Sequence, residues 1–163
     1  MRTNQQELTI QVHRMAAPAS AKKSKYRAKK IEIDGIIFDS KVEGEYYLHL
    51  KEQKEKGIIK DFELQPRFLL IDGYTNSRGE KVRPTFYVAD FKIYEPDGSC
   101  YVVDIKGMAT EAAKLKKKMF ESRYIDVPLL WIVKVKSRGG WIEYQENERL
   151  KKVAKKMKGE DAK

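Results

Sequence analysis

A three-residue turn between two strand-like segments constrains the fold of this chain most strongly. The segments are residues 85–94 (TFYVADFKIY) and 99–106 (SCYVVDIK), both rich in β-branched and aromatic side chains, and Pro96-Asp97-Gly98 lies between them. A three-residue loop that ends in glycine is a frequent hairpin connection, because glycine readily takes the left-handed conformation. The sequence therefore predicts an antiparallel hairpin over residues 85–106.

The register of this hairpin brings two acidic residues together. If Glu95 faces Ser99 across the loop, Asp90 lies directly opposite Asp104, with the two Cβ atoms about 5 Å apart. Lys106 projects from the same face, since side chains two residues apart share a face of a strand. Opposed like charges destabilise a sheet, and Mg²⁺ prefers carboxylate oxygens. The pattern is consistent with a magnesium site, and its plain alternative is a salt bridge in which Lys106 balances one aspartate.

Turn and capping signals predict the elements that precede this hairpin. Asp34-Gly35 is a strong two-residue turn signal, so residues 31–38 (IEIDGIIF) are expected to form a first hairpin. Ser40 is expected to open a helix that runs to about Lys56 and stops at Gly57.

The rest of the chain completes an alternating order of strands and helices. The further expected elements are a strand over 62–71 with Pro66 at an edge or bulge, a polar loop over 72–83, a helix from Thr110 to about Tyr124, a buried strand over 127–135, a short strand at 141–144 and a basic helix over 146–158. The inward positions expected for the second helix are Ala112, Leu115, Met119 and Phe120. This order predicts an α/β fold with a central mixed β-sheet flanked by α-helices.

Glu43 has two interpretations from its position alone. The segment Ser40–Glu43 fits the capping pattern S-x-x-E, in which the glutamate holds the start of a helix. The same carboxylate is also available to a metal, and spacing alone favours the capping role. Other chemistries lack their residues: His13 and His49 do not form a zinc set, and there is neither a nucleophile elbow nor a glycine-rich phosphate loop.

The positive charge of the chain is concentrated at its two ends. The net charge is +10, and residues 1–30 carry eight Lys or Arg against one Glu, while residues 149–163 carry seven against two acids. Basic ends suit a polyanionic partner, because neutralised phosphates release counterions; ordinary solubilising tails are the alternative. A single cysteine and the lack of a long apolar segment predict a cytoplasmic protein.

Four ordered motifs resemble those of a known family. They are F-D-S-K-x-E (38–43), L-Q-P-R-F (64–68), Y-V-A-D-F (87–91) and V-D-I-K-G (103–107). Together they resemble a phage and prophage family that is similar to the PD-(D/E)XK nucleases, which include restriction endonucleases, junction resolvases and the end-cutting nuclease of some transposons. The resemblance covers roughly residues 26–135, and it departs from the superfamily pattern at Ala89, where a proline is usual.

The resemblance implies a restriction-endonuclease-like core and Mg²⁺-dependent hydrolysis of DNA, with Mn²⁺ as a substitute metal. The implied catalytic residues are Glu43, Asp90, Asp104 and Lys106. The three acids would hold the metal with help from the Ile105 carbonyl, the lysine would position the attacking water, and Gln65 matches a supporting glutamine. On this basis Glu43 is expected to be a metal ligand as well as a helix cap.

Composition and periodicity, together with the resemblance, predict how the chain divides and what it binds. Residues 1–25 are expected to form a basic, flexible arm, 26–145 the nuclease core and 146–163 a basic terminal helix or tail. The expected DNA-binding residues are Lys22, Lys23, Lys25, Arg27, Lys29, Lys30, Lys117 and Lys118. The expected activity is cutting of branched DNA or DNA ends in phage replication or recombination, inside the bacterial host and as a monomer or homodimer. The rival hypothesis is a phage protein that keeps the nuclease fold and binds nucleic acid without cutting it.

Overall fold

The structure is a computed structural model that describes residues 29–160, with side chains up to residue 157. Its helices and strands are β1 (Ile31–Ile33), β2 (Ile36–Phe38), α1 (Lys41–Glu55), β3 (Asp61–Leu64), β4 (Arg67–Ile71), β5 (Tyr74–Thr75), β6 (Lys81–Val82), β7 (Thr85–Val88), β8 (Phe91–Tyr94), β9 (Cys100–Ile105), α2 (Glu111–Arg123), β10 (Leu129–Val135), the 3-10 turn η1 (Lys136–Arg138), β11 (Gly140–Glu143) and α3 (Tyr144–Glu160). The predicted arm over 1–25 lies outside the described residues.

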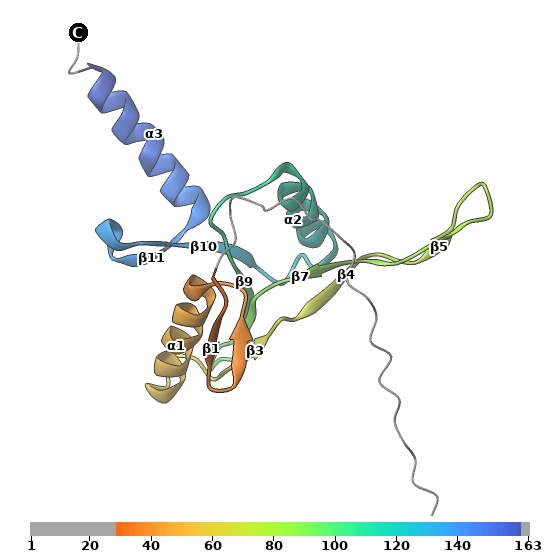
Figure 1. Cartoon of the computed structure of the whole chain (residues 1–163), viewed down its shortest axis with the longest axis horizontal. Coiled ribbons are helices and arrows are strands. Elements are labelled where there is room, and N and C mark those ends of the chain that lie inside the picture. Colours follow the sequence, from red (N-terminus) through yellow and green to blue (C-terminus); the bar gives the residue numbers. More distant parts are fainter. Residues whose placement is uncertain (1–28, 161–163) are drawn as a thin grey trace, which may run out of the picture.

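A five-stranded sheet forms the centre of the molecule, with the strand order β11-β10-β9-β8-β3. Strands β9 and β10 run parallel, whereas the other neighbouring pairs are antiparallel. Together with the helices around it (Figure 1), this sheet confirms the predicted α/β fold with a central mixed sheet. No helix in residues 29–160 combines the length and the apolar composition needed to cross a membrane.

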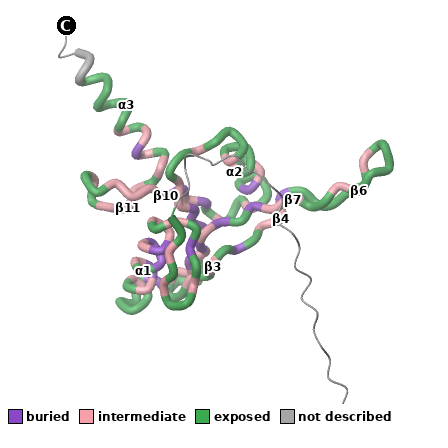
Figure 2. The backbone as a smooth tube through the Cα atoms, viewed as in Figure 1, coloured by how far each residue is buried: buried purple, intermediate pink, exposed green. Residues whose placement is uncertain are grey.

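Helices α1 and α2 cover opposite faces of this sheet. One buried cluster joins Leu50 of α1 to Val103 of β9, and a second joins Phe120 of α2 to Val102 of the same strand. Because successive side chains of a strand point to opposite faces, these adjacent valines place the two helices on opposite sides. Figure 2 shows the buried residues gathered at the sheet and on the inner sides of these helices.

The turn and capping signals of the sequence are confirmed. Strands β1 and β2 pair across Asp34-Gly35, and Ser40 is the N-cap of α1, with its hydroxyl accepting from the Glu43 N–H. The hairpin lies against α1 so closely that a Cβ on Gly44 would come within 2.8 Å of the Ile33 side chain. Glycine at this helix position therefore allows β1 to pack on α1.

The predicted hairpin over 85–106 has the expected register but is not continuous. Phe91 pairs with Val103 and Tyr94 with Cys100, and Gly98 has the left-handed φ of 91°. The strand expected over 85–94, however, is broken at Ala89-Asp90. Its first half, β7, leaves the central sheet and pairs with β4.

The strand expected over 62–71 is broken in the same way, at Gln65-Pro66. Proline lacks the N–H of a ladder bond, and Gln65 has a positive φ of 49°. The two breaks lie side by side, because the Ala89 N–H donates to the Pro66 carbonyl at 3.2 Å. Strands β4 and β7 consequently leave the central sheet together as a two-stranded ribbon.

Two further predictions are corrected by the structure. The polar loop expected over 72–83 contains strands β5 and β6, which prolong the ribbon away from the body (Figure 1). Helix α2 does start after Thr110, but Ala112 and Leu115 are exposed, and only Phe120 is fully buried. The packed side of α2 is formed by Phe120 and Met119, and the long stem of Lys117 also lies inward, with 11% of its side chain exposed.

Candidate functional site

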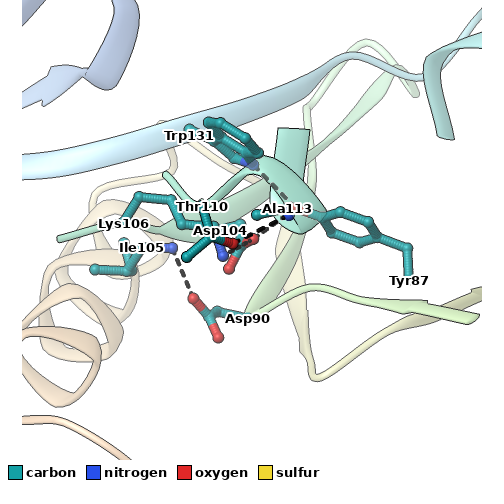
Figure 3. A network of polar contacts seen from close by, with 8 residues as sticks. All are labelled: Tyr87, Asp90, Asp104, Ile105, Lys106, Thr110, Ala113 and Trp131. Carbon is teal, nitrogen blue, oxygen red and sulfur yellow. Dashed lines mark hydrogen bonds and ion pairs between the residues drawn. The ribbon is translucent and has the colours of Figure 1, made fainter. Parts of the chain in front are cut away.

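The two predicted aspartates lie at the fork where the ribbon leaves the central sheet. Asp90 is the residue just before β8, and Asp104 lies in β9 next to the pair Phe91–Val103, so the same register places the carboxylates opposite each other. Asp104 is buried, with 5% of its surface exposed, and Asp90 is half-buried. Figure 3 shows both side chains with Lys106, the residue that directly follows β9.

Two side chains hold one oxygen of Asp104 in place, and a third supports one of them. Its Oδ2 accepts a hydrogen bond from the Tyr87 hydroxyl at 2.5 Å and forms an ion pair with Lys106 Nζ at 2.6 Å. Trp131 Nε1 donates to the Tyr87 oxygen at 2.9 Å. Because an indole nitrogen can only donate, the hydroxyl proton of Tyr87 is directed at Asp104. Two donors on one oxygen suit a charged carboxylate.

Asp90 is the unfavourably placed member of the pair. Its Oδ2 accepts the backbone N–H of Ile105 at 2.6 Å. Burial raises its pKa to about 8, with the negative charge of Asp104 adding to the rise. A nearby cation stabilises the charged form of such a carboxyl group and lowers its pKa.

Glu43 lies beside this pair and also caps its own helix. Its carboxylate accepts a hydrogen bond from the Ser40 hydroxyl at 2.9 Å, so the predicted capping role is confirmed. Glu43 also lines a pocket of about 100 Å³ together with Gln65 and Asp90, and a second hollow together with Ile105 and Lys106. The first turn of α1 thus faces the fork from the side of the sheet opposite α2.

The donor atoms around the fork suit a hard cation, although they do not form a closed cage. Carboxylate oxygens are what Mg²⁺ prefers, and the Ile105 carbonyl points to the same side of β9 as its N–H. Within residues 29–160, no three His, Cys, Asp or Glu side chains meet closely enough to hold a metal. The Glu43 carboxylate, turned to Ser40, would have to rotate to join the two aspartates.

Of the other predicted site residues in the described part of the core, two lie near the carboxylate pair or its supporting side chains and one does not. Gln65 lies next to the pair, and its backbone N–H donates to the Asp90 carbonyl at 2.9 Å. Lys117 reaches the site from α2, with Nζ 4.9 Å from the centre of the Trp131 ring and 11% of its side chain exposed. Lys118, in contrast, is exposed to solvent.

The structure describes only two of the six basic residues expected to bind DNA from the N-terminal arm. Lys22, Lys23, Lys25 and Arg27 are outside the described residues. Lys29 is exposed, and Lys30 forms an exposed ion pair with Asp39 at 2.9 Å. Neither of these two lysines has a contact with the carboxylate pair.

Tyr87 and Trp131 are the site residues that the sequence reasoning missed. Tyr87 stands in the Y-V-A-D-F motif, three residues before Asp90, and that position was the available signal. Trp131 pairs with Asp104 across the parallel strands β9 and β10. No turn connects parallel strands directly, so their register is not readable from local sequence.

The comparisons with known proteins give a family and no activity. No curated protein and no solved structure matches the chain. Residues 23–139 match the family model described as "Protein of unknown function (DUF1064)", and the chain therefore belongs to that family.

Proposed function

We propose that this protein is a metal-dependent DNA endonuclease of the PD-(D/E)XK type, with a restriction-endonuclease-like core. The observation that carries the proposal is the opposed pair of Asp90, which is half-buried, and Asp104, which is buried, with Lys106 paired to the second aspartate at 2.6 Å. Two carboxylates and a lysine, in β9 and at the neighbouring ends of β8 and β9, beside a helix glutamate, are the groups that such hydrolysis needs. The α/β sheet with a helix on each face supports the same assignment.

Each side chain has a defined task in this proposal. Asp90, Asp104 and Glu43, with the Ile105 carbonyl, would hold Mg²⁺ or Mn²⁺. A bound divalent ion supplies a more acidic water and stabilises negative charge on the phosphate. Lys106 orients the attacking water at the edge of the pair. Tyr87 and Trp131 hold Oδ2 of Asp104 in place and would leave its other oxygen available to the metal.

The charge of the chain supports DNA as the substrate. A net charge of +10, concentrated at the ends, gives affinity for a phosphate backbone without reading base sequence. Such binding fits an enzyme that recognises the shape of DNA, such as a branch or an end, in phage replication or recombination.

Cleavage of a panel of DNA substrates tests this function. The panel contains linear, nicked, supercoiled, flap and four-way junction DNA, each with Mg²⁺, Mn²⁺ or EDTA. Wild type should cut at least one substrate only with metal, and Asp104→Asn and Lys106→Ala should each lower the rate by at least about a hundredfold while DNA binding persists. Asp126→Asn, at an exposed position, is the matched control. Cutting that survives in both site variants would refute the assignment.

One observation favours a second candidate, a DNA-binding protein without catalytic activity. Lys106 already balances Asp104, so this ion pair can close the sheet without a metal. Such a protein would bind DNA with a strong salt dependence and would cut nothing on the panel with either metal.

A further inference from the structure

A two-stranded ribbon extends from the body next to the carboxylate pair. We define the ribbon as residues 67–88, which contain β4 and β7 at its base and β5 and β6 towards its tip. Figure 1 shows it projecting well beyond the central sheet, and Figure 2 shows its outer half almost wholly exposed. An extension of this kind adds little to the core, because its outer residues bury almost no apolar surface.

The tip of the ribbon is nevertheless held in one conformation. The Asn76 side-chain oxygen accepts the backbone N–H groups of Arg78 and Glu80 at 3.0 and 2.9 Å. The Asn76 amide also donates to the Glu80 carboxylate at 2.6 Å, and Gly79 takes a left-handed φ of 81°. A tip ordered in this way can present side chains to a partner at a low entropic cost.

The base of the ribbon is fixed to α2. The Tyr124 hydroxyl donates to the Leu69 carbonyl at 3.1 Å, and Arg123 binds the Leu70 carbonyl and the Asp72 carboxylate. Phe68 packs edge-on against Phe120 of α2 at 4.8 Å between ring centres. These contacts make the ribbon a stiff arm.

The outer ribbon carries cations that nothing in the described chain neutralises. Arg78, Lys81 and Arg83 are exposed, and none of them forms an ion pair within residues 29–160. Of the acids in the same region, Asp72 is paired with Arg123, and Glu80, which accepts from the neutral Asn76 amide, leaves one negative charge against these three cations. The free charge of the arm is therefore positive.

We propose that the ribbon binds double-stranded DNA, with Arg78, Lys81 and Arg83 contacting the phosphates beside a groove. A two-stranded β-ribbon fits the major groove of B-DNA. Strand β7 ends at Val88, two residues before Asp90, so the arm continues straight from the fork. At about 3.3 Å per residue, Arg78 lies at most roughly 40 Å from Asp90 along the strand, or about one helical turn of duplex. The proposal rests on the proposed function only in taking DNA as the substrate.

Equilibrium binding in EDTA tests the ribbon without any need for cleavage. The variant Arg78→Ala/Lys81→Ala/Arg83→Ala should weaken binding of a labelled duplex of about 30 base pairs at least tenfold. The slope of log K against log salt concentration should also become smaller in magnitude by about 2 to 3, because three phosphate contacts are lost. The charge-matched control, Lys54→Ala/Lys56→Ala/Lys60→Ala, removes three exposed lysines at and just beyond the C-terminal end of α1, two of which are ion-paired, and should bind within about twofold of wild type.

A conservative variant separates charge from folding. Arg78→Lys/Arg83→Lys keeps the charges and should retain wild-type affinity, and thermal melts should show all variants folded. Equal losses in the ribbon variant and the charge-matched control would overturn the proposal, as would a loss seen only with single-stranded DNA. If the ribbon variant loses duplex affinity and wild type cuts no substrate, the ribbon proposal is supported and the nuclease proposal is refuted. If wild type cuts DNA and the ribbon variant binds duplex as tightly as wild type, the nuclease proposal is supported and the ribbon proposal is refuted.

Discussion

Replacing Asp90 by asparagine should stabilise the metal-free protein at neutral pH. In the folded chain this carboxyl group is buried next to Asp104, and its pKa is raised from 3.8 to about 8. An asparagine can make the same contacts as the protonated acid, since its oxygen accepts from the Ile105 N–H and its amide donates to Asp104. The substitution therefore keeps the geometry and removes the cost of ionisation.

The size of the effect follows from the separation between the two pKa values. Between about pH 4 and pH 8 the unfolded chain has lost the proton that the folded chain still holds, so the free energy of unfolding falls as pH rises. The stability that the raised pKa of Asp90 contributes is therefore fully present below pH 4 and is lost as pH rises towards 8. At 1.36 kcal/mol per unit, the shift sets an upper bound near 6 kcal/mol. Partial exposure and the coupling to Asp104 reduce this to about 2–4 kcal/mol.

Urea unfolding in EDTA at several pH values between 4.5 and 8.5 measures this difference. The stability of wild type should fall over this range relative to Asp90→Asn, with the gap widest near pH 8. Asp126→Asn, an exposed position, should follow wild type throughout. If the curves of wild type and Asp90→Asn stay parallel across the range, Asp90 is not protonated in the folded protein and the reasoning fails.

Three further predictions concern the same site and the helix beside it. Tyr87→Phe removes a donor to Asp104 and should lower the stability by about 1–3 kcal/mol in urea unfolding, together with cleavage of the best substrate. Gly44→Ala should cost about 1–3 kcal/mol by overpacking against Ile33, whereas Gly107→Ala, which meets nothing within 4 Å, should melt like wild type. Millimolar Mg²⁺ should raise the melting temperature of wild type, and Asp90→Asn should lose this shift.

Local signals were sufficient for the elements whose ends are set by turns and caps. Pro96-Asp97-Gly98 fixed the register of β8 and β9, because a loop of given length and glycine position allows one pairing. Ser40 and Thr110 each accept a backbone N–H three residues on, as expected of N-caps. The opposed aspartates follow from that loop alone, so half of the site was readable from sequence.

The rest of the site depends on contacts between segments that no turn connects. Continuous apolar alternation in 85–94 predicted one strand, because nothing in that pattern marks the point where it changes partners. The break at Ala89 is set by Pro66 and by the positive φ of Gln65 in a different segment. The packed face of α2 also depends on where the ribbon lies. The sequence therefore offered Lys117 and Lys118 as equal candidates, and only the structure shows that Lys117 packs inward against Trp131 while Lys118 is exposed.

The fork itself explains why a hydrogen-bond acceptor stands at position 90. In a continuous hairpin the N–H of Ile105 would donate to the backbone carbonyl of Ala89, but Ala89 has turned away to pair with Pro66. The carboxylate of Asp90 accepts this N–H instead, at 2.6 Å, and so repairs the ladder at the break. A neutral hydrogen-bonding side chain would repair it as well, without the repulsion from Asp104. A second acid at this position therefore lowers the stability of the metal-free chain. We propose that binding of a cation at the fork, for hydrolysis of a phosphodiester, offsets this loss.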